Sequence, residues 1–145
     1  MKILVVNGPN LNMLGIREPE IYGSASYDDL VGLVEETAQE LGITVSCVQS
    51  NHEGVLIDEI QKAYGTYDGI VINPAGYTHT SVALLDALLA VGIPYVEVHL
   101  SRIEERESFR QFSYFTDHAL QTITGQGIHG YCEALSILNR SLAKE

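Results

Sequence analysis

The chain has 145 residues, of which 46% are hydrophobic and 19% charged, and these values are typical of a single globular domain rather than a disordered or membrane protein. The net charge of −11 disfavours binding to nucleic-acid phosphates, and no apolar run reaches the roughly 18 residues of a membrane span. The first apolar run, residues 3–6, is too short for a signal peptide, so we expect a cytoplasmic protein in which Cys47 and Cys132 are packed thiols.

Strands and amphipathic helices are predicted to alternate along the chain. Residues 2–7 contain a short apolar run, which is typical of a buried strand. Residues 27–41 carry Leu30, Val34 and Ala38 at helical spacing, with Ser26 as the expected N-cap and Gly42 as the stop signal. The other expected strands cover residues 43–49, 69–73, 94–100 and 120–124, and the other helices cover residues 54–64, 80–91 and part of 127–144.

This alternation predicts an α/β fold in which helices cover both faces of a parallel sheet. Five strands favour a flavodoxin-like three-layer α/β/α domain of strand order 2-1-3-4-5, spanning residues 1–145. Ligands of such sheets bind beyond the carboxyl ends of the strands, near the switch between strands one and three. The candidate site is therefore expected at that edge.

Polar residues and turn formers follow three of the predicted strands, at residues 7–12, 73–81 and 97–102. Because parallel strands end at the same edge, these segments should converge, which favours a binding site over three unrelated turns. The connection over residues 8–25 is longer than most loops. We expect a lid over about residues 12–25, with a plain surface loop as the alternative.

Two histidines at these strand ends are candidates for chemistry. Glu97 and His99 are two residues apart on a strand and face the same side, where the glutamate could orient the imidazole of a general acid. A packed core histidine is the alternative. His79 could cap the helix over residues 80–91 or contact a ligand, and Thr80 and Ser81 could cap the same helix or leave its N–H groups for an anion.

A small anion is the ligand class that the charges favour. One arginine lies in the expected lid and three follow the fourth strand, namely Arg17, Arg102, Arg106 and Arg110. The backbone N–H groups of Leu100 and Ser101 could bind a carboxylate there. No metal-ligand spacing, G-x-G-x-x-G motif or Walker loop is present, so we expect no metal and no nucleotide cofactor.

Five segments resemble the type II 3-dehydroquinate dehydratases. They are NGPNLNMLG at residues 7–15, REPEIYG at 17–23, QSNHEG at 49–54, NPAGYTHTS at 73–81 and EVHLS at 97–101. The resemblance is specific, because these motifs occur in the family's order between residue 2 and about residue 140. It implies a flavodoxin-like fold and a hydro-lyase that converts 3-dehydroquinate to 3-dehydroshikimate. That step belongs to the shikimate pathway of aromatic amino-acid biosynthesis or to quinate breakdown.

The resemblance also implies catalytic roles. Tyr22 would take a proton from C2, His99 would protonate the departing C1 hydroxyl, and Asn10 would stabilise the enolate through a water. A tyrosine has an ordinary pKa of roughly 10, so a nearby Arg17 in the lid would be needed to favour the phenolate.

Substrate-binding roles follow from the same resemblance. Asn73, His79 and Arg110 would hold ring hydroxyls, and Leu100 with Ser101 would hold the carboxylate. Asp86 would complete the site of a neighbouring subunit, because the family assembles as a homododecamer of four trimers.

Three positions depart from the family pattern. Gln111 and Phe112 replace two histidines and Leu85 replaces an arginine, which affects packing or affinity rather than the chemistry. The main alternative is a flavodoxin-like binding or signalling module. However, the segment after the first strand carries neither the acidic cluster of a response regulator nor the Ser/Thr-rich phosphate loop of a flavodoxin.

Overall fold

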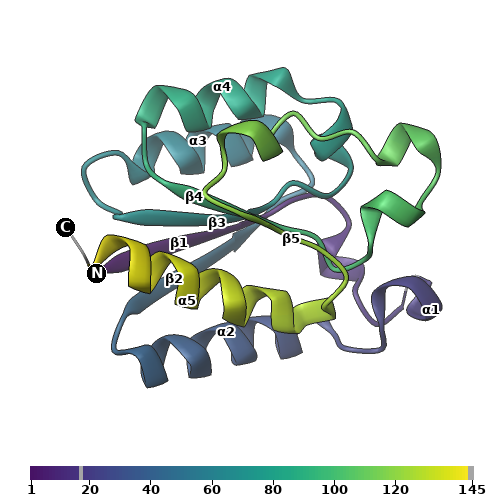
Figure 1. Cartoon of the computed structure of the whole chain (residues 1–145), viewed down its shortest axis with the longest axis horizontal. Coiled ribbons are helices and arrows are strands. Elements are labelled where there is room, and N and C mark those ends of the chain that lie inside the picture. Colours follow the sequence, from purple (N-terminus) through teal and green to yellow (C-terminus); the bar gives the residue numbers. More distant parts are fainter. Residues whose placement is uncertain (17, 144–145) are drawn as a thin grey trace.

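The computed structural model describes residues 1–16 and 18–143, which form three layers around one parallel sheet (Figure 1). The strands are β1 (Lys2–Asn7), β2 (Thr44–Gln49), β3 (Gly69–Asn73), β4 (Tyr95–Val98) and β5 (Thr122–Ile123). Their order is β2-β1-β3-β4-β5, and every neighbouring pair is parallel. The predicted fold class and strand order are therefore confirmed.

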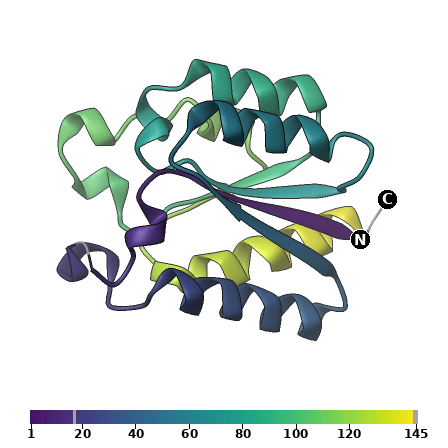
Figure 2. The same cartoon turned by 180° about the vertical axis from the view of Figure 1, so that it is seen from behind.

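Two pairs of helices cover the two faces of the sheet, as Figures 1 and 2 show. One face carries α2 (Tyr27–Leu41) and α5 (Gly130–Leu142), and the other carries α3 (Glu53–Ala63) and α4 (Val82–Val91). Side chains alternate along β1, so Ile3 and Val5 pack with α2 and α5, whereas Leu4 and Val6 pack with α3 and α4. Burial on both faces explains why the strands are continuous apolar runs.

The ends of α2 follow the predicted signals. Ser26 and Asp29 form a reciprocal capping box, in which the Ser26 Oγ accepts the Asp29 N–H at 3.1 Å and the Asp29 carboxylate accepts the Ser26 N–H at 2.9 Å. Gly42 ends the helix in the left-handed conformation, with a φ of 71°.

Several element boundaries differ from the prediction. α4 begins at Val82 rather than residue 80, because Ser81 is its N-cap and the preceding residues form the 3-10 helix η2 (Ala75–His79). His79 therefore does not cap α4. β4 and β5 are shorter than predicted, and β5 is limited to two residues because it pairs only with Glu97 and Val98 of β4. The connection over residues 8–25 contains η1 (Leu11–Met13) and the single-turn helix α1 (Pro19–Tyr22).

The segment after β4 contains three 3-10 turns in place of a regular helix: η3 (Ile103–Glu105), η4 (Ser108–Arg110) and η5 (Thr116–His118). A last 3-10 turn, η6 (Gly127–His129), leads into α5. Both cysteines are free thiols, as expected. Within residues 1–16 and 18–143, no helix combines the length and apolarity needed to cross a bilayer.

Candidate active site

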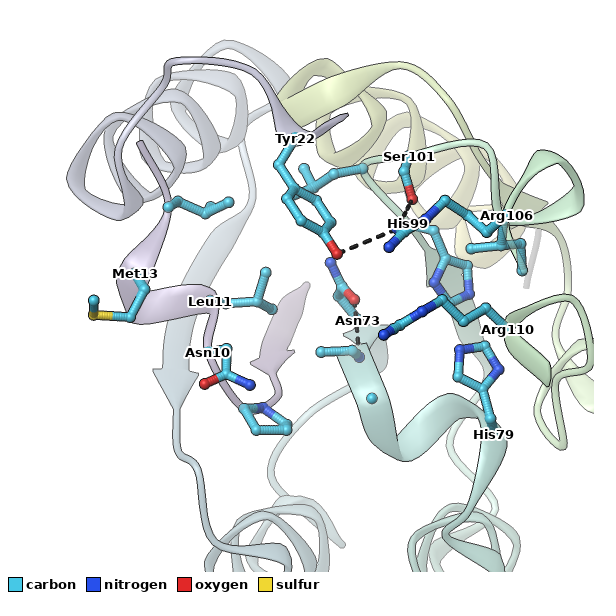
Figure 3. A pocket seen from close by; sticks show the side chains of 16 residues that line it. Asn10, Leu11, Met13, Tyr22, Asn73, His79, His99, Ser101, Arg106 and Arg110 are labelled. Carbon is cyan, nitrogen blue, oxygen red and sulfur yellow. Dashed lines mark hydrogen bonds between the residues drawn. The ribbon is translucent and has the colours of Figure 1, made fainter. Parts of the chain in front are cut away.

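A cavity of about 250 Å³ opens at the carboxyl ends of β1, β3 and β4 (Figure 3). The described residues that line it include two arginines, Arg106 and Arg110, and no aspartate or glutamate. In a chain of net charge −11, this makes the cavity a local positive site. Its volume and charge suit a small anionic molecule.

Gly8 brings the ends of β1 and β3 together. Its N–H donates to the Asn73 carbonyl at 2.8 Å, and a Cβ at this position would lie 2.4 Å from the Pro74 carbonyl oxygen. A side chain at residue 8 would therefore separate the two strand ends. Asn10 follows in the left-handed conformation with a φ of 70°, and its N–H donates to Asn51 Oδ1 at 2.9 Å. These contacts place Asn10 on one wall of the cavity.

Asn73 is fixed by a buried hydrogen-bond network below the cavity. Its Nδ2 donates to the Tyr131 hydroxyl at 3.1 Å, and its Oδ1 accepts the Ala75 N–H at 3.1 Å. The Tyr131 hydroxyl in turn donates to Asn7 Oδ1 at 2.6 Å. These partners define which side of the amide carries the donors. The second Nδ2 hydrogen of Asn73 remains for a ligand in the cavity.

Tyr22 reaches the cavity from α1. Pro19 occupies the first turn of this helix, and Gly23 ends it with a φ of 86°. The Arg106 Nη1 donates to the Tyr22 hydroxyl at 3.2 Å and to the Ser101 Oγ at 3.3 Å (Figure 3). The guanidinium carbon also lies 5.4 Å from the centre of the tyrosine ring. These contacts hold the guanidinium against both the hydroxyl and the ring of Tyr22.

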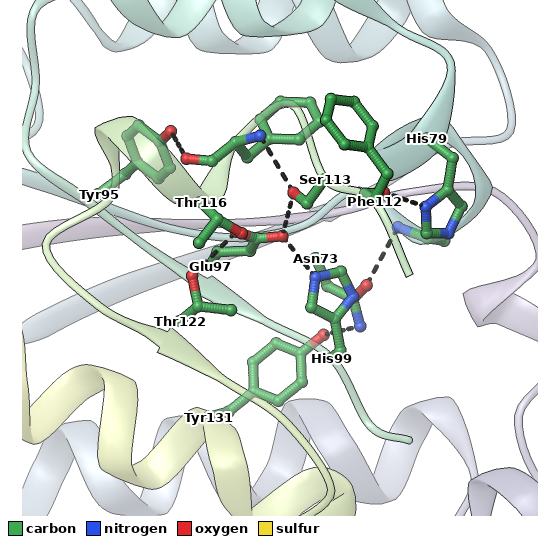
Figure 4. Close-up of polar contacts among 12 residues, drawn as sticks. Asn73, His79, Tyr95, Glu97, His99, Phe112, Ser113, Thr116, Thr122 and Tyr131 are labelled. Carbon is green, nitrogen blue, oxygen red and sulfur yellow. Dashed lines mark hydrogen bonds and ion pairs between the residues drawn. The ribbon is translucent and has the colours of Figure 1, made fainter. Parts of the chain in front are cut away.

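His99 and Glu97 form the buried pair that the sequence predicts. The His99 Nε2 lies 2.5 Å from Glu97 Oε2, and the two side chains are 5% and 0% exposed (Figure 4). Burial alone would raise the pKa of Glu97. The hydrogen bond and charge of His99 and the hydroxyls of Ser113 and Thr116 outweigh it and hold the pKa below its usual value. Because Nε2 is committed to the carboxylate, Nδ1 is the ring nitrogen left for a ligand.

His79 is held by the segment that follows η4. Its Nδ1 lies 2.5 Å from the Phe112 carbonyl oxygen, which can only accept. Burial lowers the pKa of His79, and the charges of His99 and Arg110 act in the same direction. Because the Phe112 oxygen accepts, the His79 Nδ1 carries a proton, and in the neutral tautomer Nε2 is an acceptor for a ligand hydroxyl.

Arg110 lines the same side of the cavity (Figure 3). Its Nε donates to Glu107 at 2.6 Å, and its guanidinium lies 5.0 Å from the Phe109 ring. The hydrogen bond from Arg110 holds the pKa of Glu107 below its usual value. The hydrogen bond to Glu107 fixes the orientation of the Arg110 guanidinium, and the remaining N–H groups of Arg110 are available to a ligand.

Comparisons with known proteins agree with this geometry. A family model described as "Dehydroquinase class II" matches residues 1–139. The chain belongs to this family.

Two relatives and one solved structure illustrate the match. A 3-dehydroquinate dehydratase of Geotalea daltonii is 52% identical over 144 residues, or 99% of this chain and 100% of the relative. A catabolic 3-dehydroquinase of Aspergillus clavatus is 55% identical over 129 residues, or 89% of this chain and 86% of the relative. The crystal structure of a type II dehydroquinase from Butyrivibrio crossotus superposes with a TM-score of 0.94 at 52% identity, covering 96% of this chain and 97% of that one.

Most of the type II dehydroquinase residues predicted from the sequence meet at this one cavity. Eight of them line it: Asn10, Tyr22, Asn73, His79, His99, Leu100, Ser101 and Arg110. Glu97 lies behind His99, as predicted. Asp86 is exposed on α4 and does not line the cavity of its own chain. Arg17 lies outside the described residues.

Arg106 is the site residue to which the sequence analysis assigned no individual role. The sequence did show a cluster of arginines after the fourth strand, which indicated a positive site there. However, this segment folds into irregular 3-10 turns, which have no periodicity from which the direction of each side chain could be predicted. Within the part of the chain that the structure describes, no group of three or more His, Cys, Asp and Glu side chains is arranged to hold a metal.

Proposed function

We propose that this chain dehydrates 3-dehydroquinate to 3-dehydroshikimate at the cavity, through an enolate. The observation that carries the proposal is that one positive cavity contains both a group suited to take up a proton and a group suited to donate one. A tyrosine hydroxyl is held by the Arg106 guanidinium, and an imidazole, that of His99, is held by a buried carboxylate. The first group suits a base and the second an acid.

The reaction begins with proton removal at C2. The Tyr22 oxygen, as phenolate, takes this proton, and the electron pair moves onto the ketone oxygen to form the enolate. Arg106 stabilises the phenolate, and we assign Arg17 to the same role on the family resemblance alone, because it lies outside the described residues. Asn10 stabilises the enolate oxygen through a water, which lowers the barrier because that charge develops in the transition state.

Elimination completes the reaction. The enolate electrons return to form the carbon–carbon double bond, the C1–O bond breaks, and His99 gives its proton to the departing hydroxyl, which leaves as water. Glu97 supports this step because its negative charge compensates the imidazolium. The acid and the base therefore act on different atoms of the same ring.

Substrate recognition uses the remaining cavity residues. The backbone N–H groups of Leu100 and Ser101 donate to no acceptor among the described residues, so they suit the carboxylate, next to Arg106. The ring hydroxyls are held by the Asn73 amide, the His79 Nε2 and the Arg110 guanidinium.

We propose that the whole chain, residues 1–145, is one catalytic domain that acts in the cytoplasm. In this domain residues 12–25 form a lid that closes over the substrate and excludes water. Twelve copies assemble as four trimers, and Asp86 enters a neighbour's site. In support, Asp86 shares the outer face of α4 with two exposed apolar side chains, Val82 and Leu89, each 47% exposed.

An ultraviolet assay of the conjugated enone product tests this function. Purified protein mixed with 3-dehydroquinate should produce a rising enone absorbance, at a rate that EDTA does not change. No absorbance change, or a rate that EDTA abolishes and one divalent ion restores, would refute the proposal.

A further inference from the structure

Glu97 is a buried carboxylate whose one basic partner among the described residues is His99. It is 0% exposed, and among the described residues no arginine or lysine lies within ion-pair distance of it. Four donors surround it instead (Figure 4). Its Oε2 accepts from His99 at 2.5 Å and Ser113 at 2.6 Å, and its Oε1 accepts from Thr116 at 2.8 Å and Thr122 at 3.0 Å. Each carboxylate oxygen therefore has two donors.

The hydroxyl donors come from two elements next to β4, and their directions are constrained. Thr122 lies directly opposite Glu97 in the pairing of β4 with β5. Ser113 and Thr116 lie in the segment between η4 and η5 and at the start of η5. The Ser113 Oγ accepts the Phe115 N–H at 3.0 Å, so its own hydrogen is directed at Glu97.

Neutral hydroxyls have a different effect on a buried carboxylate than a basic side chain would have. Burial without donors would favour protonated Glu97, which could no longer accept the His99 hydrogen bond in the same way. An arginine would keep Glu97 ionised but would also cancel its charge and compete with the imidazole. Hydroxyls satisfy the oxygens and leave the full negative charge to act on His99.

We propose that Ser113, Thr116 and Thr122 are positioning residues for catalysis: their hydroxyls keep Glu97 an ionised acceptor, and thereby hold the His99 imidazole oriented for proton donation. The inference rests on the proposed function, since it assigns these residues to the acid of that reaction. It adds three side chains that do not line the cavity and carry no role in the reaction above.

Several other ionisable groups surround the pair and stay unchanged in the test variants. His79 from η2 is affected by the charges of Glu97, His99 and Arg110, and Tyr95 on β4 is affected by the charges of Glu97 and Asp117. Arg106 and Tyr22 line the same cavity as His99. A change seen when a hydroxyl is removed is therefore assigned to Glu97 only if the Glu97 carboxyl itself is observed.

The test replaces one hydroxyl at a time, in Ser113→Ala, Thr116→Val and Thr122→Val, and measures kcat and KM across the pH range. At neutral pH, kcat should fall by about 10-fold, because the variant loses one hydrogen bond to the charged Glu97 carboxylate that supports His99. KM should change little, because no group that contacts the substrate is removed.

Loss of a donor raises the pKa of Glu97, so Glu97 takes up its proton at higher pH. The low-pH limb of the kcat profile should therefore move to higher pH.

Thr124→Val is the matched control. Thr124 lies two residues beyond Thr122, and its hydroxyl donates to Glu104 at 3.3 Å on the surface. This variant should keep wild-type kcat and an unchanged profile. Thr116→Ser, which keeps the hydroxyl and loses a methyl group, should restore most of the kcat that Thr116→Val loses.

Carbon-13 NMR of the Glu97 carboxyl, assigned with Glu97→Gln, gives a readout that does not depend on turnover. In each hydroxyl-deleted variant, the Glu97 resonance should titrate at higher pH than in the wild type, whereas Thr124→Val should match the wild type. A wild-type enzyme without dehydratase activity would refute the proposed function. The NMR titration would still show whether the three hydroxyls lower the pKa of Glu97. Folded Thr122→Val and Ser113→Ala with wild-type kcat and an unshifted resonance would overturn the inference.

Discussion

Arg106 connects the proposed base to the substrate end of the cavity. One nitrogen of its guanidinium donates both to the Tyr22 hydroxyl and to the Ser101 Oγ. It also lies beside the backbone N–H groups proposed for the carboxylate. The same charge can therefore contact the proposed base and attract the anion as it enters.

Removing this charge is expected to reduce activity more than stability. Arg106→Met should lower kcat/KM by about 100-fold, because a partly buried charge near both the base and the anion is lost. Arg106→Lys should retain part of the activity, since it keeps the charge but not the planar guanidinium whose Nη1 reaches both hydroxyls. Steady-state kinetics would measure both variants. Arg140→Met, at an exposed position on α5, is the control, and equal losses in Arg106→Met and Arg140→Met would contradict this role.

The site residues that the strand pattern could place are those at the ends of regular strands, whereas Tyr22 and Arg110 were assigned from the family resemblance. Asn73 and His99 could be placed together because parallel strands end at one edge, and Glu97 could be paired with His99 because alternate strand residues share a face. Arg106 and Thr116 could not be placed, because 3-10 turns in the segment after β4 orient them. In such irregular segments the directions of the side chains depend on the local path of the backbone, which a periodic sequence pattern does not predict.

At the scale of elements, the site depends on the close approach of β1 and β3. Gly8 and Asn73 are joined by a backbone hydrogen bond just where both strands end. The polar network through Tyr131 ties the same strand ends to α5. The strand order was predictable from the alternation of strands and helices, whereas this close approach was not, since it depends on how Gly8 and Pro74, the residues just past the two strands, meet.

Gly8→Ala should disturb this junction. A Cβ 2.4 Å from the Pro74 carbonyl oxygen forces the strand ends apart, and such overpacking costs about 1–3 kcal/mol. Gly32→Ala on α2 is the matched control, because a Cβ there meets nothing within 4 Å and alanine stabilises a helix by about 0.5–1 kcal/mol. Denaturant unfolding of both variants measures the difference. A Gly8→Ala protein as stable and active as the wild type would refute the steric argument.

At the scale of the whole molecule, the proposed assembly makes one chain's Asp86 part of a neighbour's site. Because Asp86 lies on the exposed face of α4, away from its own chain's cavity, two inactive variants should complement each other. Tyr22→Phe and Asp86→Ala proteins, dissociated and reassembled together in equal amounts, should regain about a quarter of wild-type activity, since random pairing joins intact residues at that fraction of sites. Assembled mixtures that stay inactive, or a fully active monomer by light scattering, would refute it.

The placement of the lysines makes a covalent imine route a poor alternative to the enolate. The chain has three lysines. Lys2 begins β1 at the end opposite the cavity, Lys62 on α3 pairs with Glu59 at the surface, and Lys144 lies outside the described residues. Borohydride added with substrate should therefore trap no adduct and leave activity unchanged. Mass spectrometry that finds reduced substrate on a lysine, together with inactivation, would contradict the enolate route.

The central claim is that Tyr22 removes the C2 proton and His99 protonates the departing hydroxyl in two separable steps. Proton NMR of 3-dehydroquinate in D₂O, followed together with enone absorbance, tests it most directly. Both Tyr22→Phe and His99→Ala should lower kcat by at least about 100-fold, but His99→Ala should still exchange the C2 hydrogen for deuterium, whereas Tyr22→Phe should exchange it no faster than free substrate. Wild-type exchange in Tyr22→Phe, with exchange lost only in His99→Ala, would contradict the assignment of base and acid.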